Sequence, residues 1–436
     1  MALFNFSKKQ NKTGMLNKDL ESFLADYSIE VMPRTAQKVE DFREILPQET
    51  RVYIAHIEGT PIEDMVATAA RLAKEGFSVM PHFPARIIKD KATLENWIAQ
   101  YQGEAGVDQA LLLAGGVTTP YGDYDSSMHL LETELLNIKL PNPIGLAAGF
   151  DKSAEVYNSL FKLGYGFVEV GTITPKRQLG NPKPRVFRLE KEQALINRLG
   201  FNNHGSEIVV KRIADDLPSG FLGINIGPNK DSTNRVEDYL ICFRKFYNLA
   251  DYITINISSP NTENLRDFHN QDELNSLIDK LKNEKKKLNS NIPLAIKVSP
   301  DLNDDQINEV SKIIMEQEIE IIIVSNTTDK NRENLKNINK LEKGGLSGKP
   351  IEKISNEAIS KFYKILKDKT KIIGVGGVSN GQDAFEKIIS GATLVQLYTG
   401  MVYRGPRIAS KISTELIDLL KNKGFKNVSE AIGTKN

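Results

Sequence analysis

Short apolar runs alternate with longer amphipathic runs along most of the chain. The apolar runs are rich in Ile, Val or Leu, and each of them stops at Gly, Pro, Asn or Ser. Continuous apolar character is typical of parallel strands that are buried on both faces, while the longer runs repeat with the period of a helix. Eight strands are predicted in the C-terminal part, at residues 144–148, 167–171, 222–226, 252–257, 294–298, 320–324, 371–375 and 393–398.

Helical patterns separate these strands, most clearly at residues 236–250, 272–288, 351–366 and 406–420. The alternation predicts an α/β fold, a closed (β/α)8 TIM barrel, with an open doubly wound sheet as the structural alternative. Nearly every predicted strand runs into a small or polar residue, which an active site at the carboxyl ends of barrel strands requires. An open sheet would concentrate such residues at one crossover point, so the pattern favours the barrel.

The first part of the chain has a separate pattern. Residues 1–20 are predicted to form a polar tail, and residues 21–134 a partial α/β segment, which is half a barrel. A loop rich in Thr, Gly, Pro and Asp follows at residues 118–125, so we place the boundary near Thr133 and the complete barrel at residues 135–436. Four strands are predicted in the partial segment, at residues 28–32, 51–56, 77–81 and 110–114.

The charge balance and the cysteine content exclude several classes of function. The chain has 57 Lys and Arg against 56 Asp and Glu, a balance that gives no basis for nucleic-acid binding. The one cysteine, Cys242, excludes an internal disulfide and a Cys-based metal site held by this chain alone, and it favours a reducing, cytoplasmic setting. Its helical context predicts a core thiol. The five histidines lack metal-ligand spacing, and no apolar run reaches the roughly 18 residues of a membrane span.

Two polar segments are candidates for chemistry. Residues 256–262 follow a predicted strand and place Ser259 between asparagines, whose amides both donate and accept hydrogen bonds, as an imide or amide ring requires. Ser259 could accept a proton in a closed site, and the alternative is a turn that ends a strand. Residues 197–203 hold three Asn, one Arg and one Gly, and they could clamp a planar anion or form a solvated turn before a helix.

A lysine and two glycine-rich turns add to this picture. Lys297 interrupts an apolar strand, where a lysine is costly unless it meets an anion or a polar ring; the alternative is a side chain that reaches solvent from a strand edge. Residues 374–378 and 398–400 end the last two predicted strands, where TIM barrels commonly bind phosphate.

Taken together, these motifs resemble the dihydroorotate dehydrogenase family, flavin enzymes of pyrimidine biosynthesis. Ser259 stands where the soluble class 1 enzymes carry Cys, and with residues 197–203 it makes the site similar to class 2, the quinone-reducing type. The motifs that carry the resemblance lie at residues 142–152, 171–175, 197–203, 256–262, 325–328, 344–348 and 374–377.

The resemblance implies FMN in the barrel mouth and dihydroorotate or orotate beside it. Residues implied to contact FMN are Ala147, Ala148, Gly149, Thr172, Asn225, Asn256, Lys297 and Ser325, with Gly348, Gly377, Tyr398 and Thr399 at its phosphate end. Residues implied to hold the substrate are Lys152, Asn197, Arg198, Leu199, Gly200, Phe201, Asn256, Asn261, Asn326 and Thr327. Ser259 would be the base, residues 260–269 a mobile lid, and Lys297 the partner of the reduced flavin's negative charge.

The partial segment is similar to the first half of a methylenetetrahydrofolate reductase barrel, at residues 28–34, 81–82 and 111–116. Glu30 stands where that family keeps an acidic catalytic residue, but Gly116 stands where it typically has Asp. The pair of amphipathic helices that gives class 2 enzymes their quinone entrance and membrane contact is not recognised before residue 135, so peripheral contact with the cytoplasmic membrane stays open. A folate- or flavin-binding module is the alternative function, and a non-catalytic scaffold is a third.

Overall fold

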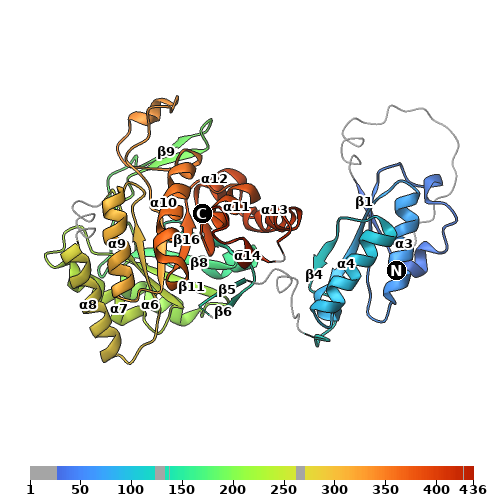
Figure 1. Ribbon diagram of the computed structural model, residues 1–436, viewed down its shortest axis with the longest axis horizontal. Helices are drawn as coiled ribbons and strands as arrows, with labels where there is room; N and C mark the ends of the chain where they lie inside the picture. The colour runs from blue at the N-terminus through green and yellow to red at the C-terminus, as the bar shows by residue number, and fades with distance from the viewer. Residues whose placement is uncertain (1–26, 123–132, 137, 262–270, 426) are drawn as a thin grey trace. The chain divides into compact units, whose positions relative to one another are not determined.

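The computed structural model describes residues 27–122, 133–136, 138–261, 271–425 and 427–436 (Figure 1). The chain divides into two compact units, residues 1–130 and 131–436, and each is described by itself. The polar tail predicted for residues 1–20 and the end of the predicted loop at 118–125 lie outside the described residues.

The second unit is built on a closed barrel of eight parallel strands, which confirms the predicted (β/α)8 fold. Each strand pairs with the next around the ring, and β17 pairs with β7 to close it. Observed bounds differ from the predicted ones by one or two residues at most strands. The strands are β7 (Ile144–Leu146), β8 (Phe167–Ile173), β11 (Phe221–Ile226), β12 (Tyr252–Asn256), β13 (Leu294–Val298), β14 (Ile321–Val324), β16 (Lys371–Val375) and β17 (Leu394–Leu397).

Helices cover the outside of the barrel (Figure 1). Local signals start several of them: Asn303 and Gln306 form a capping box on α9, and Asn234 and Asn380 cap α7 and α11. The helices of this unit are α5 (Tyr157–Lys162), α6 (Ser206–Asp215), α7 (Arg235–Phe246), α8 (Gln271–Lys287), α9 (Asp304–Glu316), α10 (Glu352–Leu366), α11 (Gly381–Ile389), α12 (Thr399–Arg404), α13 (Ile408–Asn422) and α14 (Val428–Ala431).

The apolar core of this unit includes a large outer layer between the strands and the helices. A second, smaller apolar cluster is separate from that layer. The smaller cluster includes Phe167, Phe221 and Tyr252, and Leu135 and Leu140 join it from the antiparallel pair β5 (Thr133–Leu135) and β6 (Ile138–Leu140). Cys242 belongs to the outer layer and is fully buried, which raises the pKa of its thiol and confirms the predicted core position.

A three-stranded antiparallel sheet accompanies the barrel, and the sequence pattern did not predict it. Its strands are β9 (Val186–Leu189), β10 (Ala194–Asn197) and β15 (Gly345–Gly348), with β10 in the middle. Asn197 pairs with Gly345, so two segments that are far apart in sequence meet here. Short 3-10 turns, η5 (Ile338–Leu341), η6 (Lys349–Ile351) and η7 (Lys367–Lys369), complete the unit.

The first unit is a parallel sheet in the order β1–β2–β3–β4, with a core of its own. All four predicted strands are present, as β1 (Ser28–Val31), β2 (Arg51–Ile54), β3 (Ser78–Pro84) and β4 (Leu111–Leu113). The helical elements are α2 (Pro33–Ala36), α3 (Ile62–Lys74) and α4 (Lys91–Ala105), with 3-10 turns η1 (Phe42–Glu44) and η2 (Ala85–Ile87).

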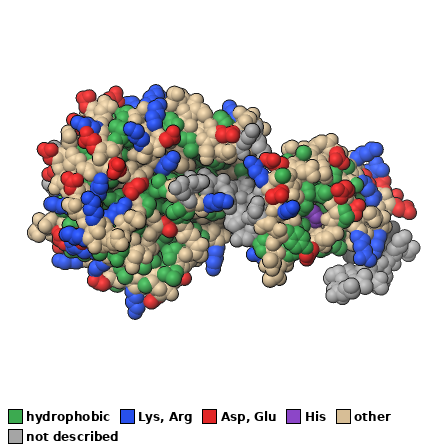
Figure 2. All heavy atoms as spheres, turned by 60° about the horizontal axis from the view of Figure 1, so that its bottom comes forward, with side chains coloured by type: hydrophobic (Ala, Val, Ile, Leu, Met, Phe, Trp, Pro, Cys, Tyr) green, Lys and Arg blue, Asp and Glu red, His purple; other side chains and the backbone are tan. Residues whose placement is uncertain are grey.

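The surface mixes both signs of charge. On the face shown in Figure 2, basic and acidic side chains are interspersed, in keeping with the net charge of +1. In the part of the chain that the structure describes, no helix combines the length and the apolar character needed to cross a membrane.

Candidate active site

A cavity lies at the carboxyl ends of the barrel strands. Strand ends, the loop after β14, strand β15 and the turn after β16 contribute to its wall. Eleven of the residues that the sequence singled out line it: Ala147, Ala148, Asn197, Lys297, Ser325, Asn326, Thr327, Gly348, Gly377, Tyr398 and Thr399. Residues from distant parts of the sequence therefore meet at one mouth.

One end of the cavity is formed mainly by backbone and hydroxyl groups. Gly376 and Gly377 have positive φ angles of 124° and 80°, which residues other than glycine rarely adopt. The hydroxyls of Ser347 and Thr399 lie 2.8 Å apart, beside Gly348. Backbone turns of this kind can present N–H groups to a phosphate.

A directed chain of hydrogen bonds joins three of the predicted residues. The Asn256 Nδ2 group donates to Thr172 Oγ1 over 2.9 Å, and the Thr172 hydroxyl donates to Asn225 Oδ1 over 2.6 Å. All three side chains are buried, and none of them lines the cavity. They form a layer of amides and hydroxyls within the barrel.

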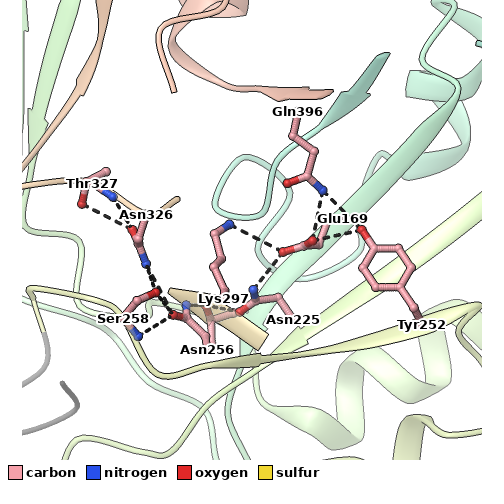
Figure 3. A network of polar contacts seen from close by, with 10 residues as sticks. Glu169, Asn225, Tyr252, Asn256, Ser258, Lys297, Asn326, Thr327 and Gln396 are labelled. Atoms are coloured by element: carbon pink, nitrogen blue, oxygen red, sulfur yellow. Dashed lines mark hydrogen bonds and ion pairs between the residues drawn. The ribbon is translucent and has the colours of Figure 1, made fainter. Parts of the chain in front are cut away.

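Lys297 lies in β13 with only 5% of its surface exposed, so the alternative of a solvent-reaching lysine is wrong. Its Nζ atom lies 3.7 Å from Oε1 of Glu169, a fully buried carboxylate on β8. Glu169 also accepts hydrogen bonds from Asn225, Tyr252 and Gln396 (Figure 3). The anion that a buried lysine requires is therefore present.

Sequence reasoning missed Glu169, Tyr252 and Gln396. A signal existed for Glu169, because it interrupts the apolar run of residues 167–170 in the way that Lys297 interrupts its own strand. Tyr252 and Gln396 carried no such signal, since an aromatic or amide residue in a strand is unremarkable in isolation.

Asn326 connects the chain of amides to the cavity wall. Its Nδ2 group donates to Ser258 Oγ over 3.0 Å and to Asn256 Oδ1 over 3.4 Å. Its Oδ1 atom accepts from the backbone N–H of Thr327 over 2.7 Å. The amide of Asn326 is thereby held in one orientation at the edge of the cavity.

Ser259 is 6% exposed and follows β12. Its Oγ atom accepts a hydrogen bond from the Asn261 backbone N–H over 3.3 Å, and Asn261 Nδ2 lies 3.4 Å from Asn197 Oδ1. The two polar segments found in the sequence, 256–262 and 197–203, are therefore in contact. Of the predicted lid at 260–269, residues 262–269 lie outside the described residues.

The backbone of residues 198–201 is held by a neighbouring loop, since Gln178 and Asn181 hydrogen bond to the carbonyl groups of Gly200 and Arg198. Phe201 is buried in the outer core. The guanidinium of Arg198 binds Glu342 over 2.7 Å and lies over the ring of Phe187. Contacts of Arg198, Leu199, Gly200 and Phe201 with substrate stay predictions.

Lys152 lies beside the mouth, close to Gly149 and Tyr398: a Cβ atom on Gly149 would be 3.8 Å from Lys152 Nζ and 3.5 Å from the Tyr398 ring. Burial of the ammonium, followed by the positive charges of Arg185 and Lys297, lowers the pKa of Lys152 to about 8. Such a cation is ready to bind an anion, because the anion would offset both causes.

Comparisons with known proteins agree with this geometry. The family model for dihydroorotate dehydrogenase matches residues 130–420. A dihydroorotate dehydrogenase (quinone) of Bartonella tribocorum is 43% identical over 305 residues, which cover 69% of this chain and 84% of that protein. The mitochondrial dihydroorotate dehydrogenase (quinone) of Mus musculus is 44% identical over 322 residues, 71% of this chain and 80% of that one.

A solved structure supports the same relationship. The crystal structure of the Eimeria tenella enzyme in complex with ferulenol has a TM-score of 0.68 and 40% sequence identity, and the match covers 70% of this chain and 89% of that one. The family match spans the whole ring of strands, from β7 to β17, and every residue that lines the mouth. With that extent of similarity in both sequence and fold, the chain belongs to the dihydroorotate dehydrogenase family.

Proposed function

We propose that the chain is a class 2 enzyme that oxidises dihydroorotate to orotate with bound FMN, in de novo pyrimidine biosynthesis, and passes the electrons to a quinone. The observation that carries the proposal is the meeting of Lys297, Asn197, Asn326 and the glycine turn at 376–377 around one cavity of the barrel mouth. The quinone in the names of the relatives supports the electron acceptor. A quinone acceptor supports peripheral contact with the membrane that holds the quinone, and the single cysteine supports a cytoplasmic setting.

Family membership implies a flavin, and the residues present fit FMN. Ala147, Val375 and Leu397 supply apolar wall for a flat ring system, while the glycine turn and the Ser347 and Thr399 hydroxyls suit a phosphate. The residues of the cavity wall that would hold FMN are Ala147, Ala148, Lys297, Ser325, Gly348, Gly377, Tyr398 and Thr399. Contacts of FMN with Gly149, Thr172, Asn225 and Asn256, which do not line the cavity, rest on the family resemblance alone.

The reaction removes a proton from C5 and a hydride from C6 of dihydroorotate, and bound FMN supplies the hydride acceptor. Lys297 places a positive charge in the cavity wall, where it stabilises negative charge that develops during the transfer. The Asn197, Asn261, Asn326 and Thr327 side chains offer the paired donors and acceptors that an imide ring needs. Lys152 offers its ammonium to the substrate carboxylate.

Ser259 is the proposed base for the C5 proton. A hydroxyl is a much weaker acid than the cysteine thiol, whose ordinary pKa is about 8.5, so Ser259 has to act where water is excluded and pass the proton on. Its burial fits that requirement, as does the backbone N–H of Asn261, which supports a developing negative charge on Oγ.

An anaerobic spectrum of the purified protein tests the proposal. We expect visible flavin absorption that dihydroorotate bleaches and a quinone restores. Ser259→Ala should keep the flavin and slow bleaching by orders of magnitude, whereas Ser413→Ala, at a buried serine on α13, should bleach at the wild-type rate. Absence of flavin, or a flavin that dihydroorotate does not reduce, contradicts the function; rapid bleaching of Ser259→Ala removes Ser259 from the role of base.

A further inference from the structure

Glu169 is a fully buried carboxylate for which the reaction itself has no use. Its Oε1 atom accepts from Asn225 Nδ2 over 2.8 Å, and its Oε2 atom accepts from the Tyr252 hydroxyl and Gln396 Nε2, each over 3.0 Å. An ionised carboxylate in such a place needs both hydrogen bonds and a positive partner. Lys297, with Nζ 3.7 Å from Oε1, is that partner.

The hydrogen-bond chain points a donor at the Glu169 carboxyl group. The Ser258 backbone N–H can only donate, and it donates to Asn256 Oδ1, so the Asn256 Nδ2 group faces Thr172. The Thr172 hydroxyl then accepts a hydrogen bond from Asn256 and donates its single proton to Asn225 Oδ1. The Nδ2 group of Asn225 is left to face Glu169, which therefore meets a donor at Oε1.

The other carboxylate oxygen also meets donors. Burial and the charge of Glu169 raise the pKa of Tyr252 well above its ordinary value, so its hydroxyl keeps a proton to donate. The buried Gln396 Oε1 atom has no hydrogen-bond partner among the described residues, while its Nε2 group bonds both Glu169 and Tyr252. Glu169 is thus hydrogen bonded by Asn225, Tyr252 and Gln396 and paired with Lys297, an arrangement that suits a negatively charged side chain.

Glu169 does not line the cavity, but Lys297 does. Lys297 thus contributes to the cavity wall while its ammonium faces a fixed negative charge (Figure 3). The carboxylate orients the ammonium and offsets part of its charge, which limits how strongly the site favours extra electrons in a ligand beside it.

We infer that Glu169 is a positioning residue that sets the redox potential of the flavin through Lys297. The inference rests on the proposed function, because it requires flavin in the mouth. Two-electron reduction adds negative charge next to Lys297, and the charge of Glu169 opposes that addition. With Glu169 neutralised and Lys297 still charged, reduced flavin becomes the more favoured form.

The decisive measurement is the ratio of reduced to oxidised flavin in equilibrium with a reference dye at pH 7. Glu169→Gln keeps the shape of the side chain and removes its charge, and we expect a shift of roughly tenfold toward reduced flavin, the size of effect that one unit charge exerts at moderate effective dielectric. For a two-electron couple, tenfold corresponds to about 30 mV. The matched control is Glu284→Gln, a buried carboxylate paired with Arg244 in the helical layer, which should leave the ratio unchanged.

A wild-type ratio in Glu169→Gln overturns the inference, even if the variant is less stable. Should that variant not fold, Lys297→Met is compared with Glu169→Leu/Lys297→Met, since apolar replacement of a buried ion pair is commonly tolerated. Because Glu169 acts through Lys297, the double variant and Lys297→Met should then give equal ratios, both shifted toward oxidised flavin relative to the wild type, and a difference between the two variants overturns the inference. The wild-type protein distinguishes failure of this inference from failure of the proposed function. If the wild type binds no flavin, or dihydroorotate does not bleach it, the proposed function has failed instead.

Discussion

Lys152 shows how the barrel changes the pKa of a single side chain. Its pKa lies near 8 because its ammonium is buried close to the positive charges of Arg185 and Lys297. At neutral pH most of the population is protonated, and the proton is lost as the pH rises through that value. An anionic ligand prefers the protonated form, so affinity for the ligand should follow the same titration.

The KM for dihydroorotate should be constant below about pH 7 and rise up to about tenfold per pH unit above the pKa of Lys152. Steady-state kinetics with a saturating quinone between pH 6 and 9.5 measure this. Lys152→Arg should abolish the alkaline rise, because guanidinium stays charged, although its different shape raises KM at every pH. Lys162→Arg on α5 is the control and should keep the wild-type profile. A flat wild-type profile would show that Lys152 does not bind the anion.

At the scale of elements, successive side chains of a strand point to opposite faces, so alternate residues share one face. On β8, β11 and β12, residues at every second position share a face, so Glu169, Asn225 and Asn256 lie on the same side of these strands as the rings of Phe167, Phe221 and Tyr252. Tyr252 stacks on Phe221 with 5.7 Å between ring centroids. The ring fits because Gly223, on the adjacent strand, has no side chain: a Cβ atom there would lie 2.1 Å from Tyr252 Cζ.

Gly223→Ala should therefore destabilise the barrel by about 1–3 kcal/mol, the usual cost of overpacking, and weaken flavin retention by displacing the Tyr252 hydroxyl from Glu169. Chemical denaturation followed by flavin release measures the effect. Gly103→Ala in α4 is the opposite control: a Cβ atom there has open space, and alanine in a helix interior gains about 0.5–1 kcal/mol over glycine. A wild-type unfolding midpoint for Gly223→Ala would mean that the barrel adapts at no cost.

At the scale of the whole molecule, the chain joins a closed barrel to a four-stranded parallel sheet. The family match begins at residue 130 and leaves the first unit outside. The similarity of that unit to half of a methylenetetrahydrofolate reductase barrel stays a prediction. Four strands lack the seventh and eighth strands whose following loops bind phosphate in a complete barrel, so we expect flavin to bind to the second unit alone.

A fragment that starts at residue 131 should retain flavin at the full-length ratio and be bleached by dihydroorotate, because the barrel closes without a free sheet edge. Residues 1–130 alone should bind none. Absorbance of the purified fragments gives the flavin-to-protein ratio, and Trp97, the one tryptophan, reports folding of the first unit separately. A 1–130 fragment that copurifies with flavin, or a barrel fragment that loses it, would contradict this division of labour.

The sequence by itself determined the eight barrel strands and several of the helices between them, because strand and helix periodicity are local properties of the chain, and its family resemblance indicated most residues at the mouth. It also marked Lys297, since a charge in an apolar strand demands a partner. Only the tertiary structure decided which residues are the partners of Lys297 and of the other polar side chains. Pairing of β10 with β15 joins segments about 150 residues apart, and the ion pair of Arg198 with Glu342 depends on it. Glu169 gained its role in the same way, because closure of the barrel sets β8, β13 and β17 around one buried point, and no local pattern encodes that meeting.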